Sequence, residues 1–162
     1  MPGDLSIRTA TNGDIGVLVA LNAFVQALHA EAHPDIFVEE PDPVPVSGWF
    51  AAAIADPNQR VWLAELDGNT AGYLVLRVIR RPPNPFKLAD PHGLIDQIAI
   101  DPKTRRRGLG RALIETARRF LRDQGITRMR AEPWAFNHGA AAFFAGQGLE
   151  PLRINRDGSV DR

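Results

Sequence analysis

A basic, glycine-rich segment, residues 105–111, carries the residue types best suited to bind an anion. Its members are Arg105, Arg106, Arg107, Gly108, Leu109, Gly110 and Arg111. The pattern predicts a turn that opens a helix, and the first N–H groups of a helix have no partner inside it. The helix dipole and the guanidinium groups add positive charge there, and glycine lets a ligand approach the backbone closely. The segment therefore predicts a phosphate or pyrophosphate site.

Two common phosphate-binding motifs do not fit this segment. It lacks the Gly-Lys-Ser/Thr ending of the nucleoside-triphosphate loop, and Leu113 stands where a dinucleotide fingerprint has its third small residue. The pattern that is present is Arg105-x-x-Gly108-x-Gly110, placed directly after an apolar run that ends in Asp101-Pro102. This pattern resembles the acetyl-CoA motif of the GCN5-related N-acetyltransferase superfamily, which cradles the CoA pyrophosphate.

A second motif lies nearer the C-terminus. It reads Asn137-x-x-Ala140-x-x-Phe143-Phe144-x-x-x-Gly148-Leu149, preceded by Trp134-Ala135-Phe136. It resembles the Asn-x-x-Ala-x-x-Phe-Tyr-x-x-x-Gly-Phe motif of the same superfamily, with that motif's common lead-in. Because the two motifs occur in the right order over residues 94–150, the chain is identified as a member of the superfamily. The N-terminal part matches in the order of its elements alone.

The resemblance implies acetyl-CoA as the co-substrate and indicates which residues would hold it. The backbone at Ile98, Ala99 and Ile100 would pair with the pantetheine arm as an added strand does, with the Ile98 amide facing the thioester oxygen. Residues 105–111 would bind the pyrophosphate. The second motif adds four implied cofactor contacts, Asn137, Ala140, Phe143 and Phe144.

The implied reaction is direct attack of a primary amine on the thioester, and it needs a base. It needs no covalent enzyme intermediate, which suits a chain without cysteine. Asp96, two residues before Ile98, and Glu132 are the candidate bases. Simple alternation along a strand places Asp96 on the same face as Ile98 and Ile100. The other interpretation of Asp96 is a strand-edge acid paired with a nearby arginine.

Phe144 departs from the superfamily pattern, which often has a tyrosine there to protonate the departing thiolate. Phenylalanine has no proton to give, and the only tyrosine, Tyr73, lies far away in the sequence. General acid catalysis contributes about 10²–10⁴-fold. Two functions therefore stay open: an N-acetyltransferase whose leaving group takes its proton from water, or a catalytically weak or inactive CoA-binding regulatory module.

His29, Glu31 and His33 cluster at the expected end of a helix. We interpret them as the rim of a substrate pocket that orients the amine. A zinc site is the rival interpretation, but two histidines at a fraying helix end with one acid make a poor ligand set, so no metal is predicted. The acceptor is expected to be an amine of a small molecule or a peptide. The superfamily resemblance leaves a homodimer open.

The elements that position these residues follow from hydrophobic periodicity. Strands are predicted at 5–9, 59–66, 70–79, 94–100, 126–131 and 149–155, and helices at 15–32, 48–55 (capped by Ser47), 109–124 and from Asn137 to about 146. Residues 80–93, with four prolines, are predicted to be a loop. The order β-α-α-β-β-β-α-β-α-β matches the superfamily, which implies an α/β (α+β) fold in one domain, 1–162. Its mixed sheet would have about six to seven strands and about four flanking helices.

Composition narrows the classes of function further. The 162 residues carry a formal net charge of zero with a pI of about 6.9, which argues against nucleic acid or a membrane surface as partner. No apolar stretch is expected to be long enough to span a membrane, and none resembles a signal peptide. The expected location is the cytoplasm.

Overall fold

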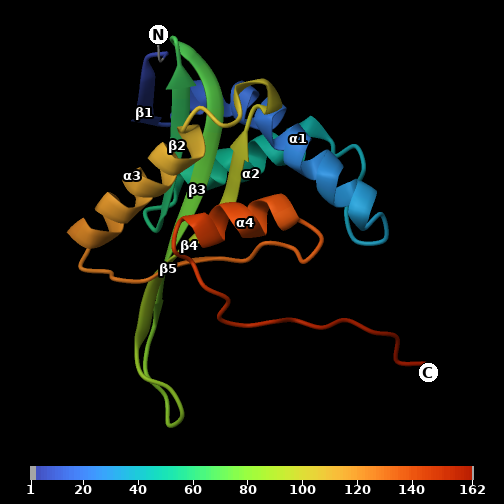
Figure 1. Ribbon diagram of the computed structural model, residues 1–162, viewed down its shortest axis with the longest axis vertical. Helices are drawn as coiled ribbons and strands as arrows, with labels where there is room; N and C mark the ends of the chain where they lie inside the picture. The colour runs from blue at the N-terminus through green and yellow to red at the C-terminus, as the bar shows by residue number, and fades with distance from the viewer. Residues whose placement is uncertain (1–2, 162) are drawn as a thin grey trace. The chain divides into compact units, whose positions relative to one another are not determined.

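The computed structural model describes residues 3–161, which fall into two compact units, Met1–Glu132 and Pro133–Arg162. Within the described chain, the first unit contains all the strands and three of the four α-helices (Figure 1). The second unit contains the helix α4, His138–Gly146. The single domain predicted over residues 1–162 stays a prediction.

One mixed sheet forms the centre of the first unit, with its strands in the order β1-β2-β3-β4-β5. The strands are β1 (Leu5–Thr9), β2 (Gln59–Leu66), β3 (Asn69–Arg81), β4 (Asp90–Ile100) and β5 (Met129–Ala131). Strands β1 to β4 pair antiparallel, and β5 pairs parallel with β4. The α+β class and the mixed sheet are confirmed, with five strands in the described chain, fewer than predicted.

The strand predicted over 149–155 does not form. These residues have no regular secondary structure, and Leu152 and Ile154 are largely exposed. Alternating apolar residues predict a strand only if one face is buried, and here neither side chain is.

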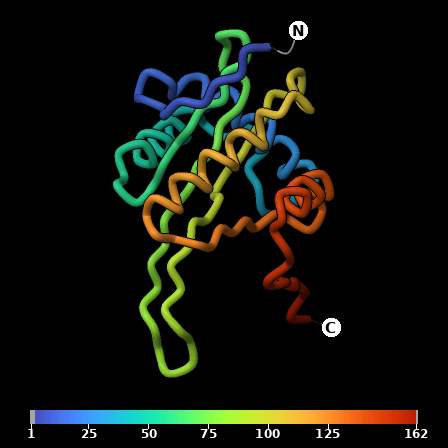
Figure 2. The backbone as a smooth tube through the Cα atoms, turned by 60° about the vertical axis from the view of Figure 1, so that its left-hand side comes forward, coloured from blue at the N-terminus to red at the C-terminus, as the bar shows by residue number. Residues whose placement is uncertain are grey.

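Three helices cover the two faces of the sheet. They are α1 (Ile15–Ala32), α2 (Pro43–Ala55) and α3 (Leu109–Asp123). Phe50 of α2 is fully buried and meets Tyr73 of β3 edge to face, with ring centroids 5.5 Å apart. On the opposite face, Phe120 of α3 contacts Trp62 of β2 at 5.6 Å. In Figure 2, α3 crosses in front of the strands while α1 and α2 lie behind them.

Helix α2 begins five residues earlier than predicted. Asp42, not Ser47, is its N-cap, and the Asp42 Oδ1 accepts a hydrogen bond from the Val44 N–H at 2.9 Å. Pro43 occupies the first turn, where an N–H has no helical partner to lose. The prolines of segment 41–45 are therefore compatible with a helix start.

The predicted loop over 80–93 is instead the outer part of a hairpin arm. Strand pairing between β3 and β4 continues to Arg81 and Asp90, and the arm projects beyond the rest of the first unit (Figure 1). Pro91 is tolerated inside β4 because its nitrogen faces away from β3. The Gly93 N–H donates to Arg128 O on the β5 side, and backbone groups alternate in direction along a strand.

Residues 12–32, which include α1, are long and apolar enough to cross a membrane by length and composition alone. The prediction that no apolar stretch is long enough to span a membrane is therefore wrong. Leu18 and Leu21 of this helix are buried in the core, while 17% of the apolar window as a whole is buried, and a single such helix near the N-terminus also occurs for other reasons. Length and composition are thus weak evidence for a span here.

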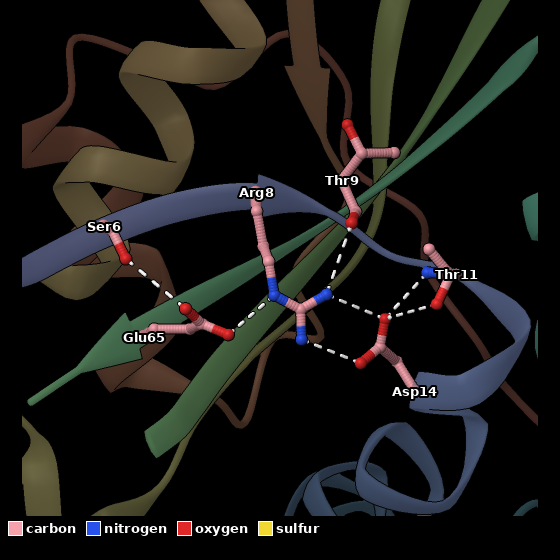
Figure 3. A network of polar contacts seen from close by, with 6 residues as sticks. All are labelled: Ser6, Arg8, Thr9, Thr11, Asp14 and Glu65. Atoms are coloured by element: carbon pink, nitrogen blue, oxygen red, sulfur yellow. Dashed lines mark hydrogen bonds and ion pairs between the residues drawn. The ribbon is translucent and has the colours of Figure 1, made fainter. Parts of the chain in front are cut away.

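An ion-pair network joins β1 to the start of α1 (Figure 3). Arg8 bonds Glu65 at 2.6 Å and Asp14 at 2.8 Å. The Asp14 carboxylate also accepts the Thr11 N–H at 2.7 Å, which is part of a capping box at the 3₁₀ turn η1 (Asn12–Asp14). The hydrogen bond from Arg8 lowers the pKa of Asp14 well below its usual range.

Candidate active site

The C-terminal half of β4 has one unpaired edge. Strand β5 pairs only with Gly93, Leu94 and Ile95, so beyond Ile95 the described chain pairs β4 with β3 alone. The Asp101 N–H donates to Ala71 O at 2.8 Å on the β3 side. Because N–H groups alternate along a strand, those of Ile100 and Ile98 point to the unpaired edge. This edge can accept an extended ligand as an added strand.

A β-bulge lies directly before this edge. Ile95 pairs with Leu76 and Gln97 pairs with Val75, which leaves Asp96 as the extra residue of β4. Directly paired residues share a face, so Gln97 lies on the α1 and α2 side.

The bulge corrects the predicted orientation of Asp96. Asp96 bonds Arg77 at 2.8 Å, and Arg77 lies on the face of Tyr73, so Asp96 does not share the face of Ile98 and Ile100. Simple alternation placed Asp96 on the face of Ile98 because it assumes a β4 strand without a bulge. The paired arginine matches the second interpretation of Asp96, and its role as base stays a prediction.

The turn after β4 has the backbone geometry that an anion site requires. The 3₁₀ turn η2 (Pro102–Thr104) is capped by Asp101, whose Oδ1 accepts the Lys103 N–H at 2.9 Å. Arg106 and Gly108 then adopt positive φ angles of 61° and 84°. Gly108 is the N-cap of α3, and a Cβ built on it would meet nothing within 4 Å.

The first turn of α3 leaves backbone donors free beside a set of exposed cations. The first helical hydrogen bond runs from the Ala112 N–H to Gly108 O at 2.9 Å, so the N–H groups of residues 109–111 have no partner within the helix. Four guanidiniums make no ion pair or side-chain hydrogen bond within residues 3–161, those of Arg105, Arg106, Arg107 and Arg111. The structure thus brings together all of the predicted pyrophosphate segment.

The other predicted site residues of the first unit are more scattered. Glu132 follows β5 directly and is exposed. His29 Nδ1 lies 2.7 Å from Val25 O, one turn back in α1, and its ring packs on Phe37. Glu31 lines a cavity of about 770 Å³ together with Asp35, Glu39 and apolar side chains of the loop after α1. Among residues 3–161, no group of three or more acids and histidines is arranged to hold a metal ion.

The predicted residues of the second unit organise helix α4. Asn137 is the N-cap, and its Oδ1 accepts the Ala140 N–H at 3.0 Å. The rings of Phe143 and Phe144 pack at 5.4 Å, and Gly148 closes the helix with a φ of 81°. The asparagine and glycine of the motif thus have a local structural role as caps. Their predicted contacts with a cofactor stay predictions.

Sequence reasoning missed a polar network on the α1 side of β4. The Tyr73 hydroxyl donates to Gln97 Oε1 at 2.8 Å, and Asn22 Nδ2 donates to both Tyr73 Oη at 3.1 Å and Gln97 Oε1 at 3.2 Å. Burial raises the pKa of Tyr73. The one signal in the sequence was Asn22, a polar residue within the apolar periodicity of α1.

The site thus consists of an unpaired strand edge that leads to a helix start with free backbone N–H groups, in a mixed sheet covered on both faces. The sequence model of the acetyltransferase (GNAT) family matches residues 22–149. This is most of the chain, which therefore belongs to that family.

Individual relatives are more distant. The chain is 29% identical over 161 residues to a mycothiol acetyltransferase of Beutenbergia cavernae, covering 96% of this chain and 48% of that protein. The chain spans about half the length of the curated relatives it matches.

Solved structures confirm the fold. A tetramutant of the BH1408 protein from Bacillus halodurans superimposes with a TM-score of 0.90 at 21% identity, covering 96% of this chain and 99% of that one. An aminoglycoside 6'-N-acetyltransferase from Acinetobacter baumannii gives 0.75 at 14% identity, with 96% and 98% covered. At these identities the likeness establishes the fold alone.

Proposed function

We propose that this protein is an acetyl-CoA-dependent N-acetyltransferase that acetylates a primary amine of a small molecule or peptide. One observation carries the proposal: the unpaired edge of β4 runs directly into the free N–H groups at the start of α3. An extended, amide-bearing arm joined to a pyrophosphate matches both parts, and CoA has this form. The family membership supports the same ligand.

The residues present fit this co-substrate. Ile98 offers backbone groups at the strand edge, and the space in front of Gly108 is open. The exposed guanidiniums of segment 105–111 supply charge for bidentate phosphate contacts. Bound acetyl-CoA supplies an activated acetyl group, whose transfer to the amine forms a C–N bond and releases CoA as the thiol.

The chain itself has three tasks in this reaction. The Ile98 N–H donates a hydrogen bond to the carbonyl oxygen, where negative charge develops. Asp96 Oδ2, the oxygen that is not bonded to Arg77, takes the amine proton through a water molecule. Water protonates the departing sulfur, because the Tyr73 proton is engaged by Gln97.

A CoA-binding regulatory module is the second candidate function. Phe144 favours it, because the position offers no proton to a leaving thiolate. A module of this kind would bind CoA at the same edge and turn without acetylating an amine.

Release of free thiol from acetyl-CoA tests the two functions against each other. The panel of amines contains polyamines, aminoglycosides, amino acids and short peptides. Wild type is compared with Asp96→Asn and Phe144→Tyr, and the exposed Asp123→Asn on α3 is the matched control for loss of a carboxylate. Turnover with one amine class that falls in Asp96→Asn but not in Asp123→Asn supports the enzyme. CoA binding without acetylation, even in Phe144→Tyr, supports the regulatory module.

A further inference from the structure

The hydrogen bonds of the Asn22–Tyr73–Gln97 network fix the role of each atom in it. A phenol has one proton, and Tyr73 Oη already accepts a hydrogen bond from Asn22 Nδ2. The Tyr73 proton therefore goes to Gln97 Oε1. Gln97 Oε1 accepts from two donors, and Nε2 is turned away from Tyr73.

This arrangement leaves two polar atoms available. Gln97 Nε2 keeps both of its N–H donors, and Asn22 Oδ1 keeps its lone pairs, because neither atom has a partner in residues 3–161. Among the described residues, the one fully buried side-chain atom without a hydrogen-bond partner is Gln59 Oε1. Gln97 Nε2 and Asn22 Oδ1 are therefore not fully buried. Each atom keeps some solvent-accessible surface on a half-buried side chain, although Tyr73, which holds both residues, is fully buried.

The two atoms lie beside the proposed site of acetyl transfer. Gln97 directly precedes Ile98, and the bulge at Asp96 turns the Gln97 side chain to the α1 face. Asn22 reaches the same point from α1. An amine that attacks a carbonyl held at Ile98 must come within about 3–3.5 Å of it. On the α1 side, beside the carboxylate of Asp96, Gln97 Nε2 and Asn22 Oδ1 then offer such an amine a donor and an acceptor.

We propose that Asn22 and Gln97 bind the acceptor and that Tyr73 is the positioning residue that orients them. Asn22 Oδ1 accepts an N–H of the amine and leaves the nitrogen lone pair free for attack. Gln97 Nε2 donates to an oxygen of the acceptor close to that amine. The acceptor class is therefore a primary amine with a hydroxyl or carbonyl oxygen on the next one or two carbons, such as an amino alcohol or an amino-acid amide.

This inference rests on the proposed function, and a matched pair of amines tests it. Ethanolamine carries a terminal hydroxyl group where propylamine carries a terminal methyl group. We expect kcat/KM to favour ethanolamine by at least about 10-fold, because a site with polar groups left unpaired discriminates against the apolar analogue. The ratio of the two amines is compared between variants, so that their difference in basicity cancels.

Two variants change the network in different ways. Gln97→Glu keeps an oxygen for Tyr73 and Asn22 but replaces the Nε2 donors with an acceptor. Tyr73→Phe removes the bond that orients Gln97. Both are expected to reduce the preference for ethanolamine to about twofold or less while the KM for acetyl-CoA stays within about twofold, since Gln97→Glu removes the donor to the acceptor oxygen and Tyr73→Phe leaves that donor unoriented. Gln124→Glu, exposed after α3, is the control for added charge, and thermal unfolding reports the stability of each variant.

The outcomes separate this inference from the function on which it rests. If wild type acetylates both amines equally, or if Gln97→Glu keeps the preference, the positioning role is refuted and the enzyme stands. If no amine is acetylated, the proposed function fails, and NMR titration of the two amines into CoA-saturated protein decides the binding role. Tighter binding of ethanolamine that is lost in Gln97→Glu supports the role there, and equal binding refutes it.

Discussion

Replacing Gly108 with alanine tests the proposed pyrophosphate site most directly. Gly108 has a φ of 84°, a conformation that costs an L-residue about 1–2 kcal/mol. Its surroundings are open, so the added methyl group strains the backbone without a clash inside the protein. The turn can release this strain by changing conformation, which misdirects the N–H groups of residues 109–111. The methyl group would also stand where a phosphate approaches.

The size of the expected rise in the Kd for CoA follows from this backbone strain. If CoA must restore the turn, its Kd rises by the factor that 1–2 kcal/mol represents, about 5–30-fold. The matched control is Gly68→Ala in the hairpin turn between β2 and β3. Gly68 has a φ of 78° and equally open surroundings, so it carries the same strain away from the site.

Titration calorimetry with CoA measures the Kd of each variant, and urea unfolding measures its stability. We expect Gly68→Ala to lose about 1–2 kcal/mol of unfolding free energy with an unchanged Kd, and Gly108→Ala, whose turn releases the strain, to lose less stability but bind CoA more weakly. A Kd within twofold of wild type for Gly108→Ala would refute the site. An equal weakening in Gly68→Ala would show that strain anywhere in the chain, rather than the turn, lowers the affinity.

Three further predictions concern acid stability, the arm and the base. Asp14→Asn should lower the free energy of unfolding by about 1–3 kcal/mol at pH 7, because it breaks charged hydrogen bonds to Arg8. Since the pKa of Asp14 is lowered in the folded state, urea unfolding should show this difference shrinking as the pH falls below about 4. Phe86→Ser, at a side chain 92% exposed on the arm, should change the free energy of unfolding by less than about 0.5 kcal/mol, and a larger loss would show that the tip is packed. Asp96→Asn should lower kcat by about 10²-fold or more without changing CoA affinity, and an unchanged kcat would exclude Asp96 as the base.

Local sequence predicted the features that depend on neighbouring residues. The turn before α3 follows from Gly108, whose positive φ only glycine adopts cheaply, and the start of α4 follows from the Asn137 cap. The family resemblance rested on these same short segments. A motif of this kind is local because its backbone N–H groups lie within a single turn of the chain.

Sequence patterns were less reliable wherever proline or a buried face decided the structure. The sequence predicts this helix only from residue 48, although Pro43 opens α2, and Pro91 obscured a strand that pairs on its other side. The apolar residues at 152 and 154 suggested a strand that has no buried face. Each pattern is compatible with two structures, and the neighbouring elements select one.

The acceptor side of the site was decided by tertiary structure alone. Pairing with β3 places the bulge at Asp96, and the bulge turns Gln97 toward α1, where it meets Tyr73 and Asn22 across separations of 24 and 75 residues. No local pattern encodes such a meeting, because it depends on the register of two strands and the packing of a helix. The sequence by itself determined a glycine-rich turn at a helix start, whereas the fold determined which side chains stand beside it.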